Sequence, residues 1–114
     1  MAKTDRLHRR QDFLKAQAVG RRYYTPSFGI CLAPNTTGSP RLGLVVGKRL
    51  GKAVRRNRVK RLLREFFRRH KGMLPSVDLI VMAKKGAAEL SYPQVEEELS
   101  QVLVKDKNRK PPSR

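Results

Sequence analysis

Residues 48–71 read KRLGKAVRRNRVKRLLREFFRRHK, and no other stretch of this 114-residue chain indicates its fold as strongly. Twelve of these 24 residues are Lys or Arg, and Glu65 is the one acidic residue among them. Apolar residues recur at the spacing i, i+3, i+4, i+7 and i+8, which is typical of one buried helix face; they are Val59, Leu62, Leu63, Phe66 and Phe67. The pattern predicts a helix from about Ala53 to His70 that packs through this face.

The opposite face of the same helix is polar and basic. At 100° per residue it carries Asn57, Arg61, Arg64 and Arg68. Arg55 and Arg56 lie near the helix start, where a cation opposes the helix dipole at a cost of about 0.3–1 kcal/mol. A solvated charge run is the alternative, but the acidic partners for i,i+4 pairs are nearly absent. The sequence therefore predicts a phosphate-binding helix start and basic ridge.

The composition narrows the class of protein. The formal net charge is +18 and the apolar content is 39%, so we expect one folded domain that binds nucleic acid, with an anionic membrane as the second choice. No apolar run reaches the roughly 18 residues of a membrane span. The N-terminal residues lack an apolar signal segment, and Cys31 is the one cysteine. We therefore expect a cytoplasmic protein without an internal disulfide or a cysteine-based zinc site.

The remaining segments predict an α+β domain over residues 1–104. In chain order they are a loose basic lead-in (1–8), a short helix (9–19), an extended segment interrupted by Pro26 (22–33), a loop (35–40), a strand (42–47), a buried strand (78–83), a helix (92–104) and a disordered basic tail (105–114).

The first strands have unequal faces. The bulky face carries Phe28, Ile30, Leu32, Leu42, Leu44 and Val46, and is expected to pack under the basic helix. The shallow face carries Gly29, Cys31, Ala33, Gly43, Val45 and Gly47. Two interpretations of the shallow face stay open: the short N-terminal helix lies close against it, which is the commoner case, or it forms a groove for an extended ligand.

Residues suited to catalysis are scarce. His8 and His70 have no Asp or Cys neighbour in the sequence, and Glu96, Glu97 and Glu98 point in different directions on a helix. Phosphate-loop, metalloprotease and nucleophile-elbow motifs are absent. We therefore predict no catalytic residue and no metal site in the protein, and expect a partner to carry any reaction.

The segment VGKRLGKAVRRNRVKRLLREFF at 46–67 closely resembles the protein subunit of bacterial ribonuclease P. RLHRRQDF at 6–13 and DLIVMAKKGA at 78–87 match that family in kind and order, so the resemblance extends from about Arg6 to Val104. It implies a two-layer α+β sandwich with a four-stranded sheet in the order α-β-β-β-α-β-α and a left-handed βαβ crossover. The periodicity of the sequence does not predict that handedness, because right-handed crossovers are the rule.

The resemblance also implies a function. In that family a catalytic RNA uses Mg²⁺ to remove the 5′ leader of precursor tRNA. The protein binds this RNA and holds the single-stranded leader between its first helix and the sheet, and it binds no metal strongly itself. The residues implied to contact the RNA subunit are Lys48, Arg49, Lys52, Arg55, Arg56, Asn57, Arg58, Lys60, Arg61, Arg64 and Arg68.

The leader would contact Phe13, Gln17, Cys31, Lys84 and Lys85. Two of these depart from the family: Gln17 stands where many members have Phe, and Cys31 where some have Tyr. Stacking on an aromatic ring is worth about 1–3 kcal/mol per base. We therefore expect leader bases to stack less strongly on aromatic side chains in this protein.

Three other functions fit parts of the sequence. A small ribosomal protein binding rRNA shares the charge and the basic tail. A DNA-binding regulator would need a partner helix at short spacing before the basic helix, where strand-like residues stand instead. A membrane-active cationic helix is disfavoured because Phe66 and Phe67 are needed for the core.

Overall fold

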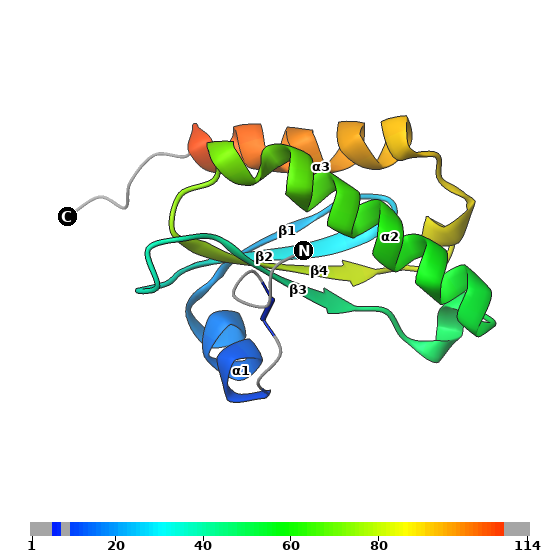
Figure 1. Cartoon of the computed structure of the whole chain (residues 1–114), viewed down its shortest axis with the longest axis horizontal. Helices are drawn as coiled ribbons and strands as arrows, with labels where there is room; N and C mark the ends of the chain where they lie inside the picture. Colours follow the sequence, from blue (N-terminus) through cyan, green and yellow to red (C-terminus); the bar gives the residue numbers. More distant parts are fainter. Residues whose placement is uncertain (1–5, 8–9, 109–114) are drawn as a thin grey trace.

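The computed structural model describes residues 6–7 and 10–108. The elements run in the predicted order α-β-β-β-α-β-α once short 3₁₀ turns are set aside (Figure 1). They are α1 (Arg10–Val19), β1 (Arg21–Tyr24), β2 (Phe28–Pro34), β3 (Arg41–Val45), η2 (Lys48–Leu50), α2 (Ala53–His70), η3 (Lys71–Met73), β4 (Val77–Ala83), η4 (Ala87–Glu89) and α3 (Tyr92–Lys107). The bounds of α2 are those that the apolar spacing predicts.

The four strands form one mixed sheet in the order β1-β2-β4-β3. β1 pairs antiparallel with β2 and β2 antiparallel with β4, whereas β3 and β4 are parallel. α2 lies in the connection between these two parallel strands. The last strand is therefore inserted between two earlier ones, and the hand of the β3–α2–β4 crossover stays a prediction from the family resemblance.

Helices lie on both faces of the sheet. α2 and α3 cover one face, and α1 lies against the other (Figure 1). The predicted two-layer sandwich describes the sheet with α2 and α3, and α1 adds a partial third layer.

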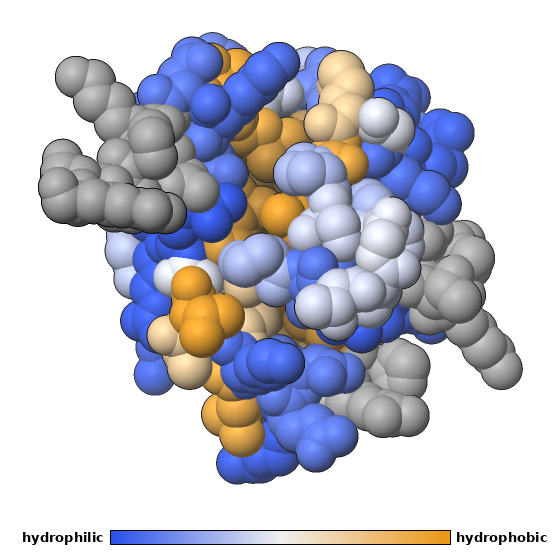
Figure 2. Space-filling model, turned by 90° about the vertical axis from the view of Figure 1, so that its left-hand side faces the viewer, coloured by the Kyte–Doolittle hydropathy of each residue, from blue (hydrophilic) through white to orange (hydrophobic). Residues whose placement is uncertain are grey.

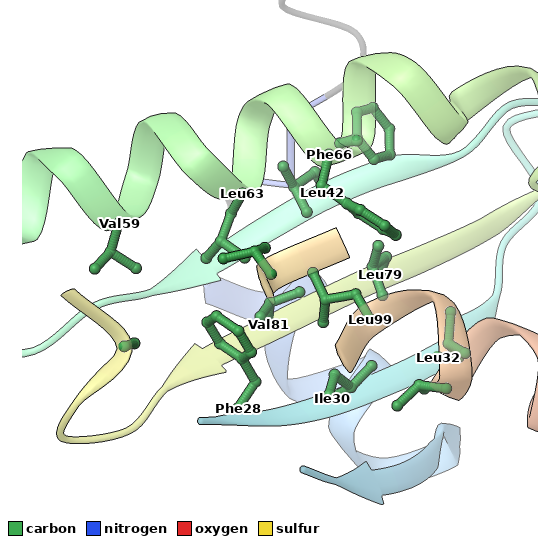
Figure 3. Packing of buried hydrophobic residues seen from close by; sticks show 14 of the residues in the cluster. Phe28, Ile30, Leu32, Leu42, Val59, Leu63, Phe66, Leu79, Val81 and Leu99 are labelled. Atoms are coloured by element: carbon green, nitrogen blue, oxygen red, sulfur yellow. The ribbon is translucent and has the colours of Figure 1, made fainter. Parts of the chain in front are cut away.

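The main core lies between α2, α3 and the bulky face of the strands (Figure 3). From α2 it takes Val59, Leu63, Phe66 and Phe67, all of which are fully buried. Beneath them lie Phe28, Ile30, Leu32, Leu42, Leu79 and Val81, and α3 adds Val95, Leu99 and Val102. The predicted apolar face of α2 is confirmed, with Leu62 half-buried at its margin.

A second cluster holds α1 close to the shallow face. Ala16 of α1 is buried with Cys31, Ala33 and Ile80, and Phe13 packs against this cluster. A Cβ on Gly43 would lie 2.9 Å from the Phe13 ring, so the glycine allows α1 to approach. Close packing of the N-terminal helix therefore explains part of the shallow face.

A buried ion pair also positions α1. Asp78 on β4 accepts hydrogen bonds from Arg41 Nε at 2.8 Å and Nη2 at 2.9 Å, and from the Asn35 amide at 2.8 Å. The same Arg41 guanidinium lies 3.8 Å from the carboxylate of Asp12 on α1. Arg41 therefore joins α1 to two strands of the sheet.

Both predicted ends of the domain need correction. Leu7 is buried and its N–H donates to the Leu42 carbonyl at 2.9 Å, so residues 6–7 are not a loose lead-in. α3 continues to Lys107, because Asp106 accepts hydrogen bonds from Arg21 Nε at 2.5 Å and Tyr23 Oη at 2.7 Å. The boundary predicted after residue 104 is therefore too early. The rest of the predicted tail, 109–114, and residues 1–5 and 8 lie outside the described residues.

Candidate RNA interface

The start of α2 is open and positively charged, as predicted. Lys52 caps the helix in an extended conformation, without a side-chain hydrogen bond, and the first turn contains no acidic residue. Gly51 has a φ of 105°, in the left-handed region that favours glycine, and so turns the chain from η2 into the helix. The N–H groups of Arg55 and Arg56 both donate to the Lys52 carbonyl, at 3.0 and 3.1 Å. The N–H groups before them lie at the positive end of the helix dipole, an arrangement that favours an anion. The exposed side chains of Lys48, Arg49 and Lys52 lead up to it.

The outward ridge of α2 carries cations without partners in the described part of the chain. Asn57 and Arg61 are exposed, and Lys60 and Arg64 are half-buried. None of the four makes a hydrogen bond or an ion pair with another described residue. The part of the ridge from Asn57 to Arg64 is therefore available to an external polyanion.

Two of the arginines predicted to bind RNA also make contacts within the protein. Arg55 donates from Nε to the Leu50 carbonyl at 3.0 Å and from Nη2 to Glu89, whose pKa this hydrogen bond lowers. Arg58 donates to the carbonyl oxygens of Ala88 at 3.1 Å and Leu90 at 2.8 Å. Both guanidinium groups therefore fix the η4 segment against α2, a role the sequence analysis missed.

Arg56 differs both from the unpaired residues of the ridge and from the paired Arg55 and Arg58. Its side chain is half-buried, and its Nε atom is buried without a hydrogen-bond partner among the described residues. A guanidinium carries five N–H donors. Although its Nε–H is buried, Arg56 can therefore offer its other donors to a ligand at the helix start.

At the far end of α2 the cations are paired. Glu65 accepts hydrogen bonds from Arg68 Nε and Nη2, each at 2.8 Å, and from Arg69 Nε at 2.9 Å. The Arg69 guanidinium also lies 4.6 Å from the centroid of the Tyr92 ring. Arg68, predicted as an RNA contact, is therefore held by a carboxylate. The spacing i, i+3 and i+4 from Glu65 was the signal that could have shown this.

The hydrogen bonds from Arg68, with those from Arg69, lower the pKa of Glu65 to about 2. Ionised Glu65 is expected to keep its pairs down to mildly acidic pH. The pairs of Glu65 stabilise the folded protein fully above the pKa that Glu65 has in the unfolded chain. This stabilisation is lost as pH falls through the lower pKa that Glu65 has in the folded protein. An NMR titration of the Glu65 carboxyl carbon checks this. Arg68→Gln should move the midpoint upward, and a wild-type midpoint near 4 would contradict the pairing.

A groove runs between α2 and the start of α3. Its cavity measures about 650 Å³ and is lined by Val54, Asn57, Arg58, Arg61, Leu62, Glu65, Arg69 and Tyr92. Three arginines and one aromatic ring in one groove suit a phosphate backbone with an unpaired base. Arg69 and Tyr92 are both absent from the sequence-based site. Tyr92 was missed because it comes from another helix, α3.

Two of the predicted leader residues, Gln17 and Cys31, line a smaller hollow between α1 and the sheet. Its cavity measures about 280 Å³ and is lined by Gln17, Arg22, Tyr24, Gly29, Ile30, Cys31, Ile80 and Met82. Gln17 is half-buried at its wall. Cys31 is 7% exposed, its thiol donates to the Ala16 carbonyl at 3.4 Å, and burial raises its pKa. Phe13 is half-buried against Gly43 and does not line the hollow.

Lys84 and Lys85 follow the end of β4 and are exposed. Lys84 Nζ donates to the Thr25 carbonyl at 2.7 Å and lies 5.5 Å from the centroid of the Tyr24 ring. The structure thus adds Arg22, Tyr24 and Met82 to the predicted residues of this hollow. These three were missed because their strand neighbours depend on the pairing of β1 and β4 with β2.

A third cavity, of about 500 Å³, lies at the opposite end of the two-helix layer. Its lining is mostly apolar, and Figure 2, which views this end, shows apolar surface between hydrophilic residues.

Across residues 6–7 and 10–108, no three His, Cys, Asp or Glu side chains come together in a way that could hold a metal ion. Within the same ranges, no helix combines the length and the apolar character needed to cross a membrane.

Comparisons with known proteins agree with these features. A family model described as Ribonuclease P matches residues 1–107. The ribonuclease P protein component of Syntrophus aciditrophicus (strain SB) is 38% identical over 107 residues, covering 93% of this chain and 90% of the relative. That of Desulfovibrio desulfuricans is 44% identical over 103 residues, covering 86% and 79%.

Solved structures match as well. The Staphylococcus aureus RNase P protein has a TM-score of 0.84 at 33% identity, covering 92% of this chain and 97% of that one. The Thermotoga maritima RNase P protein in complex with 1-(4-fluorophenyl)-2-thiourea has a TM-score of 0.79 at 34% identity, covering 92% and 100%. Sequence, fold and basic helix thus lead to one assignment: this chain belongs to the ribonuclease P protein family.

Proposed function

We propose that this protein is a subunit of a ribonuclease P ribonucleoprotein that binds the catalytic RNA and the 5′ leader of precursor tRNA and so promotes endonucleolytic 5′ maturation. The observation that carries the proposal is the part of the α2 ridge from Asn57 to Arg64, where Lys60, Arg61 and Arg64 have no partner within the described residues. Family membership supports the same ribonucleoprotein. Mg²⁺ acts through the RNA in this proposal, and no residue of the protein takes part in bond cleavage.

Binding of the RNA subunit falls to the start and ridge of α2. Phosphates approach the open N–H groups of the first turn, Arg56 and the exposed Lys48, Arg49 and Lys52. Asn57, Lys60, Arg61 and Arg64 extend the contact along the helix. Arg55 and Arg58 hold the η4 segment against α2, and Arg58 also lines the groove between α2 and α3. A helix packed on the core by Phe66 and Phe67 loses little conformational freedom when it binds.

One reconstitution tests this function. The protein is added to a bacterial ribonuclease P RNA at low Mg²⁺, and cleavage of precursor tRNA at its mature 5′ end is measured. We expect the protein to restore cleavage at Mg²⁺ concentrations where the RNA alone is slow. The protein alone should not cleave, because the described residues offer no metal cluster and the sequence offers no catalytic motif. Cleavage by the RNA-free protein, or co-purification with ribosomal subunits, would contradict the proposal.

A salt titration tests the two lysines after β4. If Lys84 and Lys85 each hold one leader phosphate, replacing both by alanine should flatten the logarithmic salt dependence of precursor binding by roughly one to two units. Mature tRNA, which lacks the leader, should be affected much less. Affinities are measured with the reconstituted holoenzyme across a salt series. An equal loss for precursor and mature tRNA would place the lysines elsewhere on the RNA.

A further inference from the structure

The strand register places four residues in one row across the whole sheet. Tyr24 on β1 lies opposite Gly29, Gly29 opposite Met82, and Met82 opposite Val45 on β3. The neighbouring row on the same face is Arg22, Cys31, Ile80 and Gly43. We call the first of these, Tyr24–Gly29–Met82–Val45, the open row.

α1 covers the neighbouring row and leaves the open row uncovered. Cys31 and Ile80 are 7% and 1% exposed beneath α1. In the open row Tyr24 is 71%, Met82 44% and Val45 38% exposed. Large exposed apolar side chains aligned on one sheet face are uncommon unless they bind something. Close packing of α1, which explains the neighbouring row, does not explain the open row.

Tyr24 is the prominent member of the open row. The Cδ1–Cε1 edge of its ring lies 3.7 Å from the position that a Cβ on Gly29 would take, so the ring lies above a strand segment without a side chain. The Lys84 ammonium is 5.5 Å from the ring centroid. Arg22 donates to the Gln17 carbonyl at 3.1 Å, which brings α1 and β1 together at the 280 Å³ hollow beside the ring.

We propose that Tyr24 is the stacking platform for one unpaired base of the precursor tRNA leader, with Gly29 and Met82 as its floor. This inference rests on the leader binding proposed above and names the residue that gives it base contacts. The charge around the row indicates the occupant: Arg22 and Lys84 lie beside Tyr24, and their charge suits a polyanion with exposed bases. A stable protein partner would need roughly 20–30 residues a side, far more than this row offers.

Tyr24 and Gln17 would have different roles within the hollow. The ring supplies a face on which any base can stack, which tolerates changes of sequence. The Gln17 side chain, with its amide donors and acceptor, lines the same hollow and can hydrogen-bond to a base edge. Gln17 thus becomes a reader of base identity beside Tyr24.

The test measures the affinities of precursor and mature tRNA in the holoenzyme reconstituted with a bacterial ribonuclease P RNA. Tyr24→Ala is expected to weaken precursor binding at least about fivefold, the ratio that corresponds to ~1 kcal/mol of stacking, and to leave mature tRNA unchanged. Tyr24→Phe should keep the wild-type affinity, because it keeps the ring. Met73→Ala is the matched control, since Met73 is 75% exposed and apolar but lines the cavity at the other end of the molecule.

Tyr24→Leu separates stacking from simple apolar contact, because leucine keeps apolar area without an aromatic face. Wild-type affinity in Tyr24→Leu would overturn the stacking role, and so would an unchanged precursor-to-mature ratio in Tyr24→Ala. Both results leave the proposed function standing if the wild-type holoenzyme prefers precursor. A wild-type holoenzyme without that preference would instead overturn leader binding itself and, with it, this inference. 2-Aminopurine placed at successive leader positions should show one position whose fluorescence rises in Tyr24→Ala.

Discussion

Phe66→Ala is expected to lower the free energy of unfolding by about 3–5 kcal/mol, the usual cost of emptying a buried aromatic site. The Phe66 side chain is 1% exposed between α2 and the sheet (Figure 3). Its ring also stacks on His70, with the centroids 4.1 Å apart. The cavity would open in the layer that positions α2, so the change should disturb the binding helix as well as the core. Urea unfolding followed by circular dichroism measures the loss.

Phe66→Leu serves as the control for this prediction. Leucine keeps most of the apolar volume, so its cost should be well below that of alanine. A loss under 1 kcal/mol for Phe66→Ala would show that α2 does not depend on this face for its packing.

Arg61→Ala combined with Arg64→Ala is expected to weaken assembly with the catalytic RNA without unfolding the protein. A hydrogen bond to a charged group is worth about 1.5–3 kcal/mol, so two lost phosphate contacts remove roughly 3–6 kcal/mol of binding free energy if their effects add. The logarithmic salt slope should also become shallower by about two units. Both side chains lie on the ridge and have no partner among the described residues, so little packing is lost.

RNA-binding titrations at several salt concentrations, together with thermal melts, check this second prediction. Lys105→Ala with Lys107→Ala is the charge-matched control, because it removes two exposed cations from the last turn of α3. Equal weakening in both double variants would mean that net charge, and not the ridge, determines assembly. A large drop in melting temperature for the arginine variant would show that the faces of α2 are assigned wrongly.

The basic helix could be predicted from the sequence because its signal is local. Apolar spacing from Val59 to Phe67 gave the buried face and the helix bounds of Ala53–His70. The partners of Arg55 and Arg58 could not be predicted in this way. Three of these partners, Ala88, Glu89 and Leu90, lie in or directly after the η4 segment, 30 to 34 residues further along the chain. Charge alone makes every arginine of such a helix look like an RNA contact, and only tertiary structure distinguishes the paired from the unpaired ones.

The hollow beside α1 could likewise be predicted only in part, because the alternating pattern of a strand is also a local signal. Alternation predicted correctly that Cys31 and Gly29 share a face, but not which of them α1 covers. That depends on where the helix ends: a Cβ on Gly20 would lie 2.3 Å from the Cys31 sulfur, so α1 meets the sheet above Cys31. The open row also needs β4 to pair between β2 and β3, an insertion that strand patterns do not encode.

The hydrogen bonds that join Asp106 to β1 make the two ends of the domain depend on each other. Arg21 and Tyr23 on β1 bind a carboxylate 85 and 83 residues later in the chain. During synthesis on a ribosome, β1 therefore cannot gain this support until the last turn of α3 has emerged. Tyr24 ends the same strand. A chain shortened before Asp106 should keep its basic helix and core but lose the support of β1, the strand that ends in the proposed leader contact Tyr24. We therefore expect such a chain to lose the proposed recognition of the leader while it keeps the proposed assembly with the RNA.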